Sequence, residues 1–315
     1  MELPPALRQA VDAALEGVPP AELARASQAL SARYRSELRD GRLHLADDLA
    51  ARAYLAARLP ATYAALRSVL GEIAALRPDF GPRSLFDFGA GPGTALWAAR
   101  DCWPDLASAA LIEASAPIRA WGERMAAGHT GLALSWSDAL VDSGPGDLVT
   151  LSYVLDELEP EARNALIDRL WALTDDTLLI VEPGTPAGWQ RTLAARARLL
   201  SAGAHLVAPC PHAHVCPLQA PDWCHFSRRV ARSRTHLQAK DAAVPWEDEK
   251  FIYIAVSRFA GAAPAARVIA PPRKGSGKVE LKLCRDDGTA VPQLFTRREG
   301  ERFKQARRAD WGDAL

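Results

Sequence analysis

The sequence predicts an α/β fold, in which a parallel sheet is covered by helices, preceded by a helical domain and followed by a small β unit. Three observations predict this. Short apolar runs alternate with helical patterns from about residue 82 to residue 184. The first run ends in a glycine-rich turn, DFGAGPGT. Farther along, KVELKLC alternates polar and apolar residues, as a half-buried strand does. Repeated strand–helix–strand units imply a parallel sheet with both faces covered.

Residues 1 to about 80 are predicted to form an N-terminal helical domain. Ala, Leu and Arg recur at three- and four-residue spacing in segments 21–38 and 46–59, which hold few β-branched residues. Pro19-Pro20, Asp40-Gly41 and Pro60 separate the helices. Nothing in this domain carries visible chemistry. Segment 58–63 is expected to pack, and the alternative is that it faces a ligand.

Residues 81–260 are predicted to form the sheet domain, with a metal-binding insertion at about 206–240, and residues 261–315 a basic C-terminal β extension. The strands expected in the sheet are 84–91, 108–115, 132–136, 146–155 and 177–184. The helices expected between them are 94–103, 117–128 and 159–174. Ligands on such sheets bind at the carboxyl ends of the strands, near the switch in strand order.

Glycines and acids follow the first three strands of this sheet. The turn after the first strand has the spacing GxGxG, which differs from the GxGxxG of dinucleotide sites, and no GxxxxGK[ST] phosphate loop is present. Glu113 ends the second strand, where an acid can accept hydrogen bonds from both ribose hydroxyls, and Asp138 follows the third. This order of glycine turn, acid and Asp resembles the class I S-adenosylmethionine-dependent methyltransferases.

That resemblance implies a methyltransferase-like Rossmann sheet and a set of cofactor-binding residues. Glu113 is implied to hold the ribose and Asp138 to contact the adenine, while Asp87 orients the turn or the cofactor ammonium. The glycines implied to line the methionine and ribose are Gly89, Gly91 and Gly93. The alternative is a sheet that keeps its glycines for packing and binds nothing.

Catalytic residues are not identified by the sequence. Segment 152–158 after the fourth strand lacks the Asn/Asp-Pro-Pro-aromatic motif of amino-group methyltransferases, and no cysteine follows strand four or five. Asp156 and Glu157 could act as a base, but acids at these positions also suit the start of a helix. No catalytic residue is therefore assigned.

Three of the five cysteines crowd into the stretch APCPHAHVCPLQAPDWCHF, at Cys210, Cys216 and Cys224. Thiolates select zinc or iron–sulfur centres, so the stretch predicts a metal site rather than three unrelated core cysteines. The ligands are separated by five and seven residues without any CxxC, a spacing that disfavours zinc without excluding it.

Several residues are candidates for a fourth ligand. If it is a cysteine, Cys284 fits best, because it ends the run KVELKLC at a strand end and precedes the turn 286–288. Cys102 lies on a predicted helix and is interpreted as structural. The histidines that would instead complete a site of three cysteines and one histidine are His212, His214 and His225.

Charge is unevenly distributed along a chain whose formal net charge is zero. Segment 267–308 holds twelve Lys or Arg against five Asp or Glu, and run 227–240 contains four arginines, one lysine and no acid. Two basic segments beside a metal site suggest a phosphate-rich partner. The four arginines of the run that are expected to face RNA, together with the basic tail, are Arg228, Arg229, Arg232 and Arg234.

Composition predicts a soluble cytoplasmic protein. No apolar stretch approaches the roughly twenty residues that span a bilayer. The first seventeen residues lack a basic end followed by an apolar block and carry three acids, which argues against a transit peptide. A reducing compartment favours metal ligation over disulfides for the cysteines.

Several motifs together resemble one family, the methyltransferase-like assembly family of the mitochondrial small ribosomal subunit, with its bacterial relatives. They are DFGAGPGT, VEPGTPAGW, CPHAHVCP, DWCHFS, PWEDEKFIYIAVSR and ARRADWGD. The resemblance implies a 4Fe-4S cluster on Cys210, Cys216, Cys224 and Cys284. It also implies association with small-subunit rRNA and ribosome assembly, with rRNA methylation as a prediction from fold. The alternatives are a small-molecule or protein methyltransferase with a structural zinc, and an RNA-binding assembly factor without turnover.

Overall fold

The structure is a computed structural model that describes residues 1–35, 44–127, 131–140 and 144–315. It divides into two compact units, each built from two stretches of chain. The first unit comprises Met1–Leu178 and Arg228–Glu249, and the second Leu179–Ser227 and Lys250–Leu315. Three sequence-based expectations lie outside the described residues, namely helix at 36–38, the break at Asp40-Gly41 and the helix end at residue 128.

The first unit begins with the predicted helices. These are α1 (Pro5–Leu15), α2 (Pro20–Arg35), α3 (Asp48–Ala57) and α4 (Leu59–Leu76). The Asp47 carboxylate caps α3 by accepting a hydrogen bond from the backbone N–H of Ala50 at 2.8 Å. Pro60 stands in the first turn of α4, where a missing N–H costs no helical bond. The prediction of helices before residue 80 is confirmed for the described residues.

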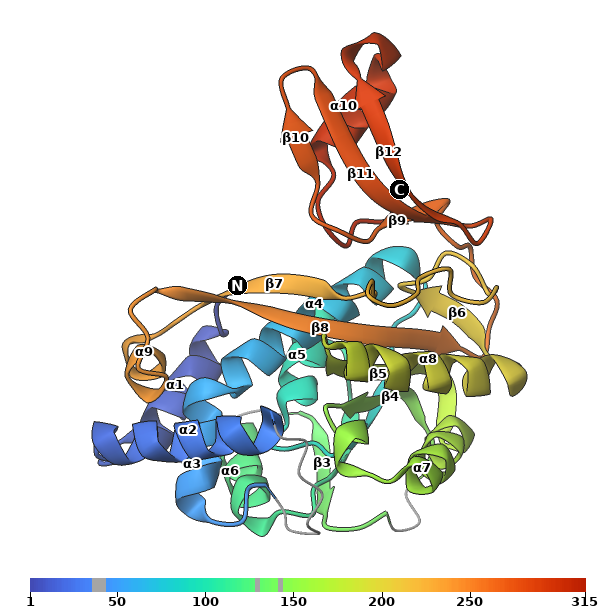
Figure 1. Cartoon of the computed structure of the whole chain (residues 1–315). Helices are drawn as coiled ribbons and strands as arrows, with labels where there is room; N and C mark the ends of the chain where they lie inside the picture. Colours follow the sequence, from blue (N-terminus) through green and yellow to red (C-terminus); the bar gives the residue numbers. More distant parts are fainter. Residues whose placement is uncertain (36–43, 128–130, 141–143) are drawn as a thin grey trace. The chain divides into compact units, whose positions relative to one another are not determined.

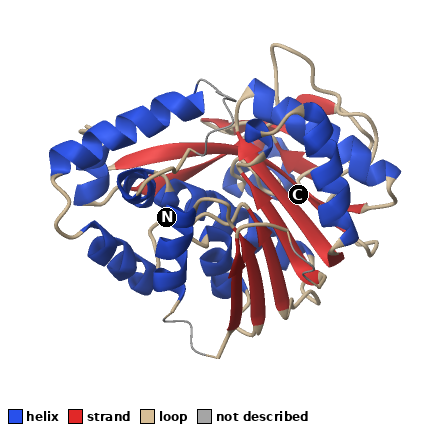
Figure 2. Ribbon diagram, turned by 90° about the horizontal axis from the view of Figure 1, so that it is seen from below, coloured by secondary structure: helices blue, strands red, loops and turns tan. Residues whose placement is uncertain are grey.

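The predicted alternation of strands and helices is also confirmed. The strands are β1 (Ser84–Phe88), β2 (Ser108–Ile112), β3 (Ala133–Ser137), β4 (Gly146–Ser152) and β5 (Thr174–Pro183). The helices are α5 (Thr94–Cys102), α6 (Ala116–Ala126), the 3-10 turn η1 (Leu155–Glu157), α7 (Pro160–Ala172) and α8 (Pro186–Ser201). Figure 2 shows the strands in red with helices on both faces. The helices bury the apolar strand residues and leave strand ends for a site.

The order of the strands places a switch point at β1. The sheet has the order β3-β2-β1-β4-β5-β8-β6, with β7 paired to β8. Strand β1 runs parallel to both β2 and β4. Chain order therefore reverses at β1, and its carboxyl end is where ligands bind in open α/β sheets. The remaining elements are β6 (His205–Ala208), β7 (Phe226–Ala231), α9 (Arg234–Ala239) and β8 (Trp246–Ser257), with β6 antiparallel to β8.

The end of the second unit contains a separate small sheet. Its elements are β9 (Ala266–Val268), β10 (Arg273–Gly275), β11 (Lys278–Arg285), β12 (Ala290–Thr296), the 3-10 turn η2 (Arg297–Glu299) and α10 (Glu301–Arg308). All of its strand pairs are antiparallel. Helix α10 lies beside β11 and β12 (Figure 1). Its Phe303 and Ala306 pack with Val279, Leu281 and Phe295 in one buried cluster. The predicted strand KVELKLC and its following turn are thus present, as β11. No helix in the described part of the chain is long and apolar enough to cross a membrane.

Candidate cofactor and metal sites

The glycine turn after β1 is held in a conformation that requires glycine. Gly89, Gly91 and Gly93 have φ values of 69°, 53° and 78°. A Cβ on Gly89 would lie 2.3 Å from Cγ2 of Val154, and one on Gly93 would lie 3.3 Å from the ring of Trp136. A Cβ on Gly91 would meet nothing within 4 Å. Among the three, Gly91 is therefore the glycine whose backbone faces open space.

Glu113 connects the end of β2 to this turn. Its Oε2 accepts a hydrogen bond from Gly91 N–H at 2.8 Å and its Oε1 accepts one from Ser115 N–H at 2.8 Å. Burial raises the pKa of Glu113, while the two backbone N–H groups act to lower it. Each carboxylate oxygen accepts more than one hydrogen bond, so Glu113 retains acceptor capacity for a ligand hydroxyl.

Asp87 lies beneath the turn, within β1. It is buried, and Thr150 on β4 donates a hydrogen bond to its Oδ1 at 2.6 Å. Burial raises the pKa of Asp87 to about 7; the Thr150 hydrogen bond lowers the pKa and the charge of Glu113 raises it. Asp138, by contrast, lies exposed just beyond β3. Backbone pairing places the ends of β2 and β3 side by side, since Glu113 N–H donates to Ser137 C=O at 2.9 Å.

A polar group at the end of β4 was not predicted from the sequence. Tyr153 has a positive φ of 60°, which is uncommon for a non-glycine residue. Its hydroxyl donates to Oε1 of Glu249 at 3.2 Å, and Nη2 of Arg58 lies 3.7 Å from the same oxygen. Burial raises the pKa of Tyr153 well above its usual value. The sequence signal that could have revealed this group is the alternation of side chains along β8, because residues two apart on a strand share a face.

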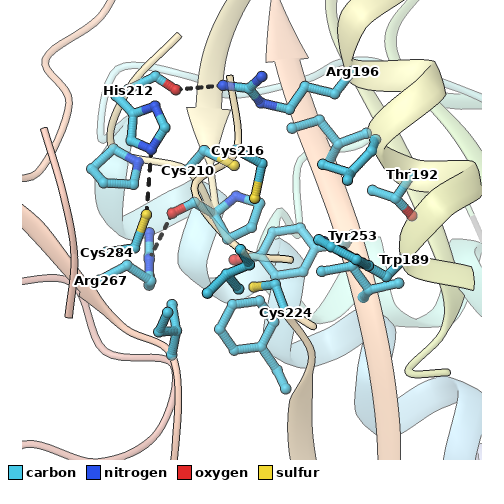
Figure 3. A pocket seen from close by; sticks show the side chains of 18 residues that line it. Trp189, Thr192, Arg196, Cys210, His212, Cys216, Cys224, Tyr253, Arg267 and Cys284 are labelled. Carbon is cyan, nitrogen blue, oxygen red and sulfur yellow. Dashed lines mark hydrogen bonds between the residues drawn. The ribbon is translucent and has the colours of Figure 1, made fainter. Parts of the chain in front are cut away.

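The four predicted metal ligands line one cavity in the second unit. Cys210 follows β6, Cys216 and Cys224 lie in the loop before β7, and Cys284 lies on β11. The cavity has a volume of about 30 Å³, and apolar groups such as Trp189 dominate its wall. Figure 3 shows the four sulfur atoms around this space. Cys102 on α5 does not line it.

Burial controls the protonation of these thiols. It raises the pKa of Cys210 and Cys224, and that of Cys284 to about 12. The neighbouring cysteines contribute in the same direction, because each thiolate would repel the next. Without a cation the thiols of Cys210, Cys224 and Cys284 are therefore neutral, and a bound metal would have to stabilise their thiolate forms.

Two buried arginines hold the cysteine loop through hydrogen bonds to its backbone carbonyls. Nη2 of Arg196 on α8 donates to the carbonyls of His212 and His214 at 2.7 and 2.9 Å. Arg267 on β9 donates from Nε to the Pro209 carbonyl at 3.0 Å (Figure 3). The two arginines are 5% and 1% exposed. No local sequence pattern separates such arginines from those on the surface.

The predicted metal centre is not assembled as a ligand group. Over residues 1–35, 44–127, 131–140 and 144–315, no three or more His, Cys, Asp or Glu side chains stand where they would hold a metal ion. Among the candidate histidines, His212 lies beside a thiol, with its Nε2 at 3.4 Å from Sγ of Cys284. His214 is exposed, and His225 stacks on Trp223 at 5.1 Å between ring centroids. The thiol donors fit a soft metal, but in the described residues the side chains are not arranged as a ligand group.

The basic run 227–240 does not present its cations freely. Arg229 forms two hydrogen bonds with Asp248, at 2.9 and 3.1 Å. Arg232 and Lys240 both bind Oε2 of Glu247, at 2.9 and 2.6 Å. Acids on β8 thus partner three cations of this run, and the expectation that its arginines face RNA stays a prediction.

Comparison with known proteins identifies the family. The model of the family described as mitochondrial small ribosomal subunit Rsm22 matches residues 48–315. The chain belongs to the Rsm22 family. The predicted family is thereby confirmed, over a match that covers the sheet, the cysteine loop and the C-terminal β unit.

The curated relatives are longer proteins. The human ribosome assembly protein METTL17, mitochondrial, is 29% identical over 287 residues, which are 83% of this chain and 61% of that protein. The Rsm22-cox11 tandem protein 2, mitochondrial, of Schizosaccharomyces pombe is 24% identical over 327 residues, 83% of this chain and 42% of that protein. This chain thus spans less than two thirds of the length of each.

Solved structures with a similar chain path include methyltransferases. An O-methyltransferase family protein from Burkholderia thailandensis has a TM-score of 0.46 at 15% identity, covering 77% of this chain and 72% of that one. A magnesium protoporphyrin IX methyltransferase from Synechocystis with bound SAM has a TM-score of 0.42 at 16% identity, covering 73% of this chain and 91% of that one.

The prediction of a cytoplasmic protein is wrong, because the matched family and the curated relatives are mitochondrial. That prediction used the lack of a membrane-length apolar stretch and the composition of the first seventeen residues.

Proposed function

We propose that this Rsm22-family chain is a methyltransferase-like factor that binds S-adenosylmethionine and a 4Fe-4S cluster, and acts on or binds small-subunit rRNA during ribosome assembly. The observation that carries the proposal is the family match over residues 48–315. The human relative METTL17 is a ribosome assembly protein, which supports the same role.

The cofactor part of the proposal rests on the glycine turn. Open space at Gly91, the remaining acceptor capacity of Glu113 and the exposed Asp138 lie at the ends of β1, β2 and β3. Asp87, Gly89 and Gly93 complete the proposed cofactor residues. S-adenosylmethionine would bring a ribose for Glu113 and an adenine for Asp138, and when bound it supplies an activated methyl group.

Calorimetric titration tests this part. Gly91→Val should lower S-adenosylmethionine affinity at least tenfold, because a side chain would enter the open space. Gly17→Val is the matched control, since Gly17 also has a positive φ, of 77°, and no atom within 4 Å of its Cβ position. Equal affinity in the two variants would remove the glycine turn as the cofactor site.

The metal part rests on the four cysteines that share one cavity. Cys210, Cys216, Cys224 and Cys284 are the proposed ligands, and a cluster would supply the positive charge that their buried thiolates require. Arg196 and Arg267 hold the loop backbone in place beside them. Ligation would fasten the loop to β11 and close a segment of more than fifty residues.

Anaerobic purification with iron and sulfide analysis tests the metal. About four irons per chain are expected, as in other 4Fe-4S centres bound by four cysteines. Cys216→Ser should lose the iron, whereas Cys102→Ser, which changes a cysteine outside the cavity, should retain it. A colourless protein that holds zinc would favour the alternative, a small-molecule or protein methyltransferase with a structural zinc.

Methyl transfer is a separate question from binding. No catalytic residue is assigned, and the hydroxyl of Tyr153 after β4 is already bonded to Glu249. That bond favours the alternative of an assembly factor that binds RNA without turnover. Transfer of labelled methyl from S-adenosylmethionine to precursor small subunits decides between the two, because only an active enzyme labels the RNA.

A further inference from the structure

Two separate stretches of the C-terminal β unit meet at one end of its sheet. The turn between β10 and β11 lies beside η2, because Arg297 N–H donates to the Gly277 carbonyl at 3.1 Å. Lys278 on β11 pairs with Thr296, the last residue of β12. A Cβ on Gly277, where φ is 73°, would lie 3.4 Å from the Arg297 side chain. The fold thus joins residues 273–278 and 297–299 into one surface.

This end of the sheet gathers positive charge. We call its four exposed cations the basic tip, which consists of Lys274, Lys278, Arg297 and Arg298. Within the described residues none of the four forms an ion pair. The two nearby acids are engaged, since Glu280 binds Arg273 at 3.0 Å and Glu299 accepts from Thr296 N–H at 2.7 Å. Together with Arg273, this end of the sheet holds five cations against the carboxylates of Glu280 and Glu299, which leaves a net charge of +3.

The frame below the basic tip is rigid. Thr296 and Glu299 form a reciprocal capping box at η2. Val279 and Phe295, paired across β11 and β12, are buried directly behind the tip. The cations therefore project from fixed backbone positions rather than from a mobile tail, which lowers the entropy lost on binding a charged partner.

The other basic stretch of the chain differs in one respect. In run 227–240 the acids of β8 bind Arg229, Arg232 and Lys240. Those cations are already solvated by carboxylates, and a phosphate would have to displace them. The basic tip has no such competitor among the described residues, so a polyanion would lose only water and counterions there.

We propose that the basic tip is the surface through which this chain binds the phosphate backbone of RNA. This inference rests on the proposed rRNA-binding function and names the site for it. Four unpaired cations on a surface formed by a hairpin turn and a 3-10 turn contact successive phosphates without reading bases. Binding through the tip is therefore independent of sequence and strongly salt-dependent.

The test is a salt titration of rRNA binding by the anaerobically purified full chain. Binding is measured by the fluorescence anisotropy of a small-subunit rRNA fragment. The variant K274Q/K278Q/R297Q/R298Q should bind at least tenfold more weakly at low salt. Its slope of log affinity against log salt should be smaller by about 3, because each lost phosphate contact removes about 0.7 to 0.9. Unchanged thermal unfolding shows that the variant is folded.

Two matched double variants within the same unit distinguish binding at a local surface from an effect of overall positive charge. R297Q/R298Q removes two cations of the tip, and R307Q/R308Q removes two exposed cations at the other end of α10, about 10 Å along the helix. The first pair should lose at least threefold in affinity and the second less than twofold. Equal losses would overturn the proposal, since charge in general would then explain binding.

Other outcomes also decide the matter. If the unaltered chain binds rRNA and the fourfold variant binds it equally, the basic tip fails while the proposed function stands. If the unaltered chain does not bind rRNA, both fail. Loss of binding to anionic lipid vesicles or to an acidic peptide in the fourfold variant, with RNA binding unchanged, would assign the tip to that partner instead and overturn the proposal.

Discussion

The glycine turn and the cysteine cavity differ in how far the protein alone completes them. At the turn, glycines with positive φ and the Glu113 carboxylate fix the backbone through hydrogen bonds. At the cavity, four cysteines surround a shared space without forming a ligand group among the residues that the structure describes. The first site depends on backbone geometry, which the chain supplies itself. The second needs a cation to convert its thiols to thiolates, so we expect its order to depend on metal.

Metal removal should have the largest effect, and it should change the cysteine loop far more than the glycine turn. Loss of the proposed cluster should raise hydrogen exchange in residues 209–226 at least 100-fold, equivalent to about 2.7 kcal/mol of lost protection. Exchange at the glycine turn, residues 87–94, should change less than twofold. Mass spectrometry of the loaded and the chelator-treated protein measures both segments, and equal change in both would refute the contrast.

Replacement of Arg267 should weaken the cavity even without metal. Arg267→Met leaves the Pro209 and Gly312 carbonyls without their buried donor and should cost about 2 kcal/mol in urea unfolding. Arg273→Met is the control, because that side chain is 84% exposed and its change should stay within about 0.5 kcal/mol. Equal costs would show that Arg267 does not brace the loop.

Asp87 should make the glycine-turn side sensitive to pH. Its pKa rises from an ordinary 3.8 to about 7 on folding, so between these values the folded state holds a proton that the unfolded state has released. Stability should therefore fall as pH rises through this window, by at most about 1.4 kcal/mol per pH unit, and level off above pH 7. Asp87→Asn should flatten this dependence in unfolding measured from pH 4 to 8. An unchanged slope would contradict the assignment.

Glu113 should show the smallest effect. Glu113→Gln retains one of the two oxygen acceptors, so we expect about 1 kcal/mol of destabilisation together with weaker S-adenosylmethionine binding. Glu123→Gln on the exposed face of α6 should alter neither quantity. Wild-type affinity in Glu113→Gln would exclude Glu113 as a ligand of the cofactor.

Local patterns predicted the parts of the molecule that local forces determine. The strands and helices from β1 to β5 follow from apolar periodicity, and the turn follows from glycines at positions with positive φ. The sequence also predicted that Cys284 accompanies the three clustered cysteines, because a strand end beside a turn is a suitable place for a ligand. That these four line one cavity is consistent with this expectation.

Features that depend on distant packing were not predictable in the same way. Arg196 and Arg267 have surface-like sequence surroundings, and only the cysteine loop folding over them makes them buried donors. Arg229 and Arg232 looked free because Asp248 and Glu247, which bind them, arrive from the next strand. Charge counted along the chain thus does not show which cations have acid partners in the fold, as Arg229 and Arg232 do and, among the described residues, the cations of the basic tip do not.

The metal content of the anaerobically purified chain tests the central claim most directly. Iron, sulfide and zinc are measured together with the absorption spectrum, for the unaltered chain and for Cys284→Ser. A brown protein with about four irons and four sulfides, both lost in the variant, is the predicted result. A colourless protein that holds zinc, or iron that remains in Cys284→Ser, would contradict the account.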